Sequence, residues 1–132
     1  RAAEGYMGRL RCVQEISAVT AACMMVKTSV FKAVGGFDEE LKVAFNDIDL
    51  CMKVRKYGVK IVFTPYAELY HYESKSRGME DTPEKQLRFS REVNCFRRKW
   101  ERELLKGDPY YNPNLTLNNT DCSLRKQEKN GD

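Results

Sequence analysis

The chain has 132 residues, close to the commonest length of a single domain, so one domain with one core is expected. Its 42% hydrophobic and 32% charged residues, with one Trp, seven Tyr and six Phe, exclude a disordered chain. The formal net charge is +4, and the longest apolar stretch, residues 16–26, is about half of the ~20 residues that a membrane-spanning helix needs.

The N-terminus predicts neither a signal peptide nor a complete protein. Arg1 is not an initiating Met, and no apolar segment follows it, so we expect part of a longer protein. The five cysteines form no Cys-x-x-Cys pair, which argues against a disulfide framework or a zinc site. Because Cys23, Cys51 and Cys95 lie in apolar patterns, we expect buried, reduced thiols in a cytoplasmic protein.

The first half of the chain predicts a strand and two helices after an irregular segment, residues 1–17. The apolar run Ala18–Val26 predicts a central strand covered on both faces. Thr28 is expected to cap a two-turn helix that ends at Gly35-Gly36. Asn46 is expected to cap a second, mostly buried helix that reaches Tyr57, with Asp49 completing a capping box.

The second half predicts two strands, a long helix and a tail. Val59–Phe63 and Ala67–Glu73 are the strands, and Pro83 opens a helix that stops at Gly107. One apolar face of this helix comprises Phe89, Val93, Phe96, Trp100 and Leu104. The predicted fold class is therefore α/β, a small mixed sheet with flanking helices over residues 1–107, followed by a polar tail, residues 108–132, that is extended or disordered.

Two acids, Asp47 and Asp49, lie in the first turn of the second predicted helix and point to different sides. Acids favour helix N-termini by roughly 0.3–1 kcal/mol each, and residue types alone favour this explanation over catalysis. A carboxylate just after a Gly-Gly-Phe loop is also well placed to face a substrate. The only histidine, His71, is more often structural when alone, and its neighbourhood lacks the other ligands of a zinc site.

Six motifs nevertheless occur in a fixed order. They are residues 34–39 (VGGFDE), 45–51 (FNDIDLC), 56–58 (KYG), 64–65 (TP), 71–74 (HYES) and 76–78 (SRG). This series resembles the second half of inverting family 2 glycosyltransferases of the GT-A fold, in the bacterial branch that includes rhamnosyltransferase-like enzymes. The resemblance covers residues 17–78 strongly and residues 108–113 weakly.

The resemblance implies roles for individual residues. Asp47 matches the general base that takes the proton of the acceptor hydroxyl. The family usually carries Glu before this Asp, and Asn46 replaces it here. Asn46, Asp49 and Arg77 are expected to contact the substrate, with Arg77 near the diphosphate or the donor sugar. His71 matches a histidine that helps to hold a divalent metal or the diphosphate.

The resemblance also implies a reaction, transfer of a sugar from a nucleoside-diphosphate (nucleotide-sugar) donor to a hydroxyl of a glycan or lipid-linked acceptor in surface polysaccharide synthesis. Mg²⁺ or Mn²⁺ is expected to assist the full enzyme. In such enzymes a nucleotide-binding half with an Asp-x-Asp motif precedes this region, and no Asp-x-Asp occurs before Ala21. We therefore expect this chain alone to be inactive and to bind nucleotides very weakly.

The long predicted helix is basic, with eight Lys or Arg and four Glu between Glu84 and Lys106. The favoured explanation of these charges is a solvated face of the helix. The alternative is peripheral contact with the inner face of the cell membrane. Two other functions stay open, a non-catalytic interaction domain and a basic nucleic-acid-binding module. No nucleic acid partner is expected, because Phe96 and Trp100 lie on the predicted core face.

Overall fold

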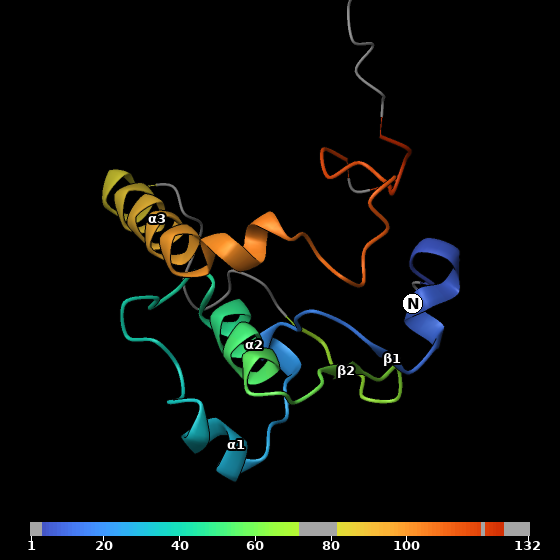
Figure 1. Cartoon of the computed structure of the whole chain (residues 1–132), viewed down its shortest axis with the longest axis horizontal. Helices are drawn as coiled ribbons and strands as arrows, with labels where there is room; N and C mark the ends of the chain where they lie inside the picture. Colours follow the sequence, from blue (N-terminus) through green and yellow to red (C-terminus); the bar gives the residue numbers. More distant parts are fainter. Residues whose placement is uncertain (1–3, 72–81, 120, 126–132) are drawn as a thin grey trace, which may run out of the picture.

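The computed structural model of the chain describes residues 4–71, 82–119 and 121–125. Its elements are η1 (Tyr6–Arg11), β1 (Gln14–Glu15), η2 (Ala21–Cys23), α1 (Thr28–Ala33), α2 (Asn46–Lys56), β2 (Val62–Phe63) and α3 (Pro83–Leu105). Figure 1 shows α2 near the middle of the molecule, between α1 and α3. The structure contains both helices and strands, as the predicted α/β class requires. Within the described ranges, however, the sheet is one antiparallel pair of strands instead of a mixed sheet.

Helix α2 ends at the predicted place and begins one residue earlier than predicted. Phe45 precedes the helix in the left-handed conformation, with φ 63°, and Tyr57 is its C-cap. Gly58 follows with φ 89°, a conformation that glycine adopts without strain, and this ends the helix. The helix buries Asp49, Leu50, Cys51 and Val54.

The two ends of α3 confirm the predicted long helix. Thr82 is its N-cap, and the Thr82 Oγ1 accepts a hydrogen bond from the Lys85 backbone N–H at 3.4 Å. Pro83 is the first helical residue, where its missing N–H has no consequence. The helix ends before Gly107, whose φ is 76°. Every helix in the described part of the chain is too short or too polar to cross a bilayer.

Only the middle of the predicted apolar face of α3 is buried. Phe96 and Trp100 are 6% and 4% exposed, whereas Phe89 and Leu104 are 44% and 46% exposed. With Leu41, the two buried rings form the hydrophobic core, and the residues packed against it are Phe45, Ile48, Met52 and Cys95. The core therefore joins α2 to α3, as the two predicted apolar faces require.

The predicted central strand Ala18–Val26 is wrong. Residues 21–23 form the short 3₁₀ helix η2, whose cap Thr20 accepts a hydrogen bond from the Ala22 N–H at 3.3 Å. Met25 is 99% exposed, and Cys23 is exposed rather than buried. An apolar run becomes a central strand only where other strands pair with both of its edges. Among the described residues, the strands β1 and β2 pair only with each other.

The two strands predicted after α2 are shortened or missing. Only residues 62–63 of Val59–Phe63 form β2, which pairs with β1 in the register Gln14↔Phe63. The predicted strand Ala67–Glu73 is wrong over residues 67–71, which are irregular and exposed, and its last two residues lie outside the described part. A strand needs a partner for its backbone N–H and C=O groups, and none lies beside this segment among the described residues.

Helix α1 confirms the predicted two-turn helix with a different cap. Lys27, not Thr28, is the N-cap, and no side chain caps this end. At the other end the Gly36 N–H bonds the Phe31 carbonyl at 2.9 Å, and Gly35 and Gly36 have φ values of 81° and 65°. The Gly-Gly pair therefore ends the helix as predicted.

The tail is more ordered than predicted up to Arg125. Leu115 and Leu124 form an antiparallel bridge, and the Thr116 N–H bonds the Ser123 carbonyl at 2.8 Å. Leu115 and Thr116 are buried. A local turn thus satisfies backbone groups that an extended tail would leave to water.

Candidate active site

The candidate site is built around the first turn of α2, which follows a backbone outlier. Phe45 has a positive φ, which is uncommon for a bulky residue. Its ring stacks on Phe96 of α3, with the centroids 5.1 Å apart, and lies 6.0 Å from the ring of Phe89. Packing against α3 therefore holds the turn that starts the helix.

Asp47 lies half-buried in this first turn and is bonded only to backbone N–H groups. Its Oδ1 accepts from the Ile48 N–H at 2.9 Å, and its Oδ2 accepts from the Ala21 N–H of η2 at 3.1 Å. The predicted capping box is wrong, because Phe45 is the N-cap and Asn46 is already helical. Asp47 has no ion pair among the described residues.

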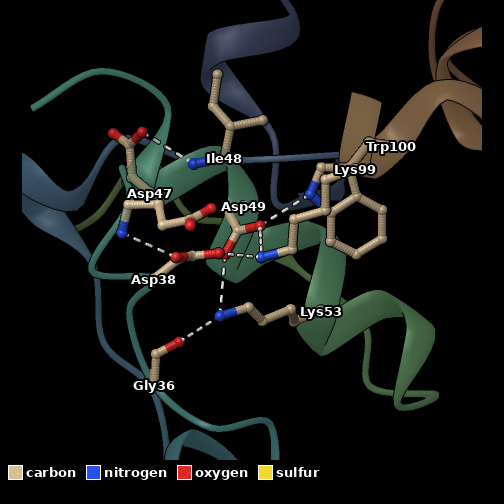
Figure 2. Close-up of polar contacts among 9 residues, drawn as sticks. Gly36, Asp38, Asp47, Ile48, Asp49, Lys53, Lys99 and Trp100 are labelled. Carbon is tan, nitrogen blue, oxygen red and sulfur yellow. Dashed lines mark hydrogen bonds and ion pairs between the residues drawn. The ribbon is translucent and has the colours of Figure 1, made fainter. Parts of the chain in front are cut away.

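Asp49 has the opposite environment, with no exposed surface. Its Oδ1 accepts from the Trp100 indole N–H at 2.8 Å and from the Lys99 ammonium at 2.7 Å. The Lys53 ammonium approaches its Oδ2 at 2.9 Å. Figure 2 shows these three donors converging on one carboxylate from α2 and α3. A buried carboxylate is costly unless it is paired and hydrogen-bonded, and here it is both.

The same two lysines extend this network to the Gly-Gly-Phe-Asp loop. Lys99 also bonds Asp38, and Lys53 donates to the Gly36 carbonyl at 2.7 Å. Asp38, Asp49, Lys53 and Lys99 form a neutral cluster, which we call the lysine–aspartate cluster. It joins three segments that the sequence separates, the loop after α1, helix α2 and the C-terminal half of α3.

The lysine–aspartate cluster shifts the pKa values of two of its members. The hydrogen bond from Lys99 lowers the pKa of Asp38, and the Glu40 backbone N–H adds to this. Burial acts to lower the pKa of Lys99, but its hydrogen bonds to Asp38 and Asp49 outweigh burial and raise it. Both shifts favour the charged forms that make the pairs. Separately, burial raises the pKa of the Cys51 thiol, which favours the protonated form.

A second buried acid, Glu92 of α3, supports the segment just before α2. It is 4% exposed, and its Oε2 accepts from the Ala44 backbone N–H at 2.6 Å. Its Oε1 lies 3.9 Å from Arg88 Nε. Contacts from α3 therefore fix the chain on both sides of Asp47, at Ala44 and at Asp49.

Sequence patterns missed the roles of Lys99, Trp100 and Glu92. Lys99 and Glu92 were assigned to a solvated face, and Trp100 only to the apolar face. One signal was available, because a buried indole N–H needs an acceptor, and an acid on a facing helix supplies one. Which acid supplies it follows only from the three-dimensional packing.

Of the predicted site residues outside α2, the structure describes only His71. His71 is exposed, and within the described residues no hydrogen bond or ion pair joins it to Asp47. Arg77 lies outside the described residues. No cluster of three or more His, Cys, Asp or Glu that suits a metal ion occurs in the described part. The described residues thus do not fit a divalent metal site, and the roles of Asn46, Asp49, Arg77 and His71 at a substrate or metal stay predictions.

Comparison with known proteins identifies similar chains. Residues 5–93 match the family model described as glycosyltransferase-like family 2. The chain is 58% identical over 121 residues to the uncharacterized protein y4gI of Sinorhizobium fredii, and 40% identical over 114 residues to the O-antigen biosynthesis protein RfbC of Myxococcus xanthus. It is also 36% identical over 62 residues to an N-acetylglucosaminyl-diphospho-decaprenol L-rhamnosyltransferase of Mycobacterium tuberculosis.

Each of these relatives is much longer than the segment that matches this chain. The matches cover 91% and 86% of this chain with y4gI and RfbC, but only 13% and 8% of those proteins. The match to the rhamnosyltransferase covers 47% of this chain and 20% of that protein. No solved structure matches the chain.

Proposed function

Since this chain belongs to glycosyltransferase-like family 2, we propose that it supplies the acceptor side of an inverting GT-A glycosyltransferase with Asp47 as the general base. One observation carries the proposal, the contrast between the two acids of the motif. Asp49 is buried, paired with two lysines and bonded to an indole, whereas Asp47 is partly exposed and has no cationic partner among the described residues. A base needs access and a free lone pair, and only Asp47 has both.

The proposed step moves one proton to the Asp47 carboxylate. The acceptor oxygen attacks the anomeric carbon, and the bond from that carbon to the leaving nucleoside diphosphate breaks. As the new glycosidic bond forms, the hydroxyl proton passes to a carboxylate oxygen of Asp47. Attack from the face opposite the leaving group inverts the anomeric centre. The described side chains form no group of three or more His, Cys, Asp or Glu that could hold a metal.

The names of the relatives suggest the class of substrate. One is an O-antigen biosynthesis protein, and another is named as an L-rhamnosyltransferase acting on N-acetylglucosaminyl-diphospho-decaprenol. We extend this to a nucleotide-sugar donor and a glycan or lipid-linked acceptor in surface polysaccharide synthesis. Such an acceptor suits a cytoplasmic protein at the inner face of the membrane. The nucleic-acid alternative is not supported, because the rings that bases would stack on, Phe96 and Trp100, are buried.

A substitution in the longest natural form of the protein tests the base. Asp47→Asn keeps the shape of the side chain and removes its basicity, so we expect kcat for sugar transfer to fall roughly 10²–10⁴-fold. Transfer is measured with a panel of nucleoside-diphosphate sugars and a lipid-diphosphate-linked glycan. Asp121→Asn, an exposed acid in the tail, is the matched control and should keep full activity. Unchanged transfer by Asp47→Asn would instead favour a non-catalytic interaction domain.

A binding measurement on the 132-residue chain tests the division between donor and acceptor sides. Because the described residues form no metal site, we expect calorimetric titration with UDP and Mn²⁺ to give binding weaker than the micromolar range. Micromolar binding would mean that this chain holds a donor site, and would contradict the proposed acceptor-side role.

A further inference from the structure

Helix α3 contacts the chain at three points that surround Asp47. Glu92 bonds the Ala44 N–H, Phe96 stacks on Phe45, and Lys99 with Trp100 bonds Asp49. Asp47 itself has no hydrogen bond or ion pair with α3 among the described residues. The conformation of its turn is therefore set by its neighbours.

We propose that Asp49 is a positioning residue, and that its bonds to Lys99 and Trp100 of α3 fix the first turn of α2 so that the Asp47 carboxylate keeps its direction. This inference rests on the proposed role of Asp47 for its consequence in catalysis. Its structural part, control of the direction of Asp47, stands on the contacts alone.

The surroundings of Asp47 explain why it needs this support. Among the described residues, its one hydrogen-bond partner outside its own helix is the Ala21 N–H, which belongs to an exposed segment with Met25 almost fully exposed. The buried side of α2 is the rigid side, since interiors are closely packed. Asp49 lies two residues after Asp47, and its own N–H bonds the Phe45 carbonyl at 2.8 Å. A shift of Asp49 would thus move the whole turn that carries Asp47.

The backbone of Phe45 points to the same conclusion. A bulky residue with φ 63° is held in a sparsely populated conformation, which persists only where surrounding contacts enforce it. The Phe96 ring and the Glu92 carboxylate act just before the turn, and the Asp49 bonds act just after it. α3 itself departs from helical geometry at Trp100, with φ −114° and ψ 19°, the residue whose indole bonds Asp49.

The complete burial of Asp49 distinguishes positioning from substrate binding. Its carboxylate has no exposed surface: Oδ1 accepts from the Trp100 indole and is paired with Lys99, and Oδ2 is paired with Lys53 but receives no hydrogen bond from the described residues. A substrate hydroxyl would have to displace a lysine or the indole. A role through Asp47 requires no such displacement.

The Ala21 amide proton provides a test on the 132-residue chain that does not depend on activity. Because the Ala21 N–H donates to Asp47 Oδ2, its NMR chemical shift should follow the titration of that carboxylate. The part of the pH-dependent shift change at Ala21 that comes from the Asp47 carboxylate should vanish in the Asp47→Asn variant, which identifies it. Trp100→Phe keeps most of the ring volume and removes one N–H donor, and Asp49→Asn keeps the size of the side chain and removes its charge.

We expect the titration amplitude at Ala21 to fall by half or more in both variants. Tyr110→Phe is the matched control, because it also removes a single aromatic donor, the hydroxyl that bonds Glu15 at 3.1 Å, and it should keep the wild-type amplitude. If Trp100→Phe does not fold, Asp49→Asn and the graded variant Lys99→Gln decide the question. A wild-type amplitude in the folded variants would overturn the proposal.

An activity measurement separates this inference from the proposed function. In the longest natural form of the protein, Trp100→Phe should lower kcat by roughly tenfold with the KM for the donor unchanged, because it misplaces the base without touching the donor. A reduced Ala21 amplitude with unchanged kcat would keep the positioning of Asp47 and reject its role as base. An unchanged amplitude would reject the positioning, whatever Asp47→Asn does to transfer.

Discussion

The two sides of α2 face regions of very different construction. On one side, α3 contributes two buried rings, a buried Glu92 and the lysine–aspartate cluster. On the other side, residues 14–26 contribute β1, η2 and the almost fully exposed Met25. Within the described residues, the hydrogen bonds across this second side are the Asp47–Ala21 bond and two long bonds between Cys51 Sγ and the backbone of Val19.

The difference shows which sequence patterns can be satisfied within this chain. An amphipathic helix needs one apolar face to bury, and α2 and α3 supply that face to each other. An apolar strand needs paired edges and two covered faces, and residues 18–26 have neither among the described residues. The candidate base lies at the boundary between the two regions.

The largest loss of stability on the α3 side of α2 should come from Asp49→Ala. It leaves the Lys53 and Lys99 ammonium groups and the Trp100 indole without their shared acceptor in the core. Removing one partner of a buried ion pair costs about 3–5 kcal/mol, so we expect the free energy of unfolding in urea to fall by that amount.

The matched control for this loss is Glu68→Ala, which removes an exposed acid from the irregular segment after β2. It should change the free energy of unfolding by less than about 0.5 kcal/mol. Equal losses for both variants would remove the distinction between the two regions.

The helices could be predicted from the sequence because their signals are local. Pro83 after Thr82, the Gly35-Gly36 pair and Gly58 each act within one turn of the chain. The strand Ala18–Val26 could not be predicted correctly, because its pattern says only that both faces are apolar. Whether anything covers those faces depends on residues far away in the sequence.

The sequence singled out Asp47 and Asp49 as candidates, but not the different surroundings that each has in the structure. The order of motifs indicated Asp47 as a base and Asp49 as a substrate contact, and their spacing placed them on different sides of the helix. Their separation follows from the helix, which turns one toward η2 and the other toward α3. The partners Lys99 and Trp100 lie some fifty residues away, where no spacing rule relates them to Asp49.

A smaller effect on stability is expected from the Asp38–Lys99 pair, since Asp38 is the more exposed of the two acids in the lysine–aspartate cluster. Lys99 lowers the pKa of Asp38 in the folded chain below its ordinary value of 3.8. The stabilisation is therefore complete above about pH 4 and is lost as the pH falls through the folded-state pKa. Urea unfolding between pH 5 and pH 2.5 should show a weaker loss of stability in Asp38→Asn than in the wild-type chain. Identical pH dependence would mean that the Asp38–Lys99 pair contributes nothing.

The smallest effect on the free energy of unfolding should come from substitutions in residues 18–26, on the side of α2 away from α3. Met25 is 99% exposed, so Met25→Ser removes no buried contact and should change the free energy of unfolding by less than about 0.5 kcal/mol. Met52, which packs against the core formed by Leu41, Phe96 and Trp100, is the matched position on the opposite side. Met52→Ser should cost clearly more, because it removes buried apolar contacts and puts a hydroxyl beside that core. Urea unfolding of the two variants under one set of conditions measures the difference directly. A loss at Met25 equal to that at Met52 would show that residues 18–26 bury apolar surface, and the contrast between the two sides of α2 would not hold.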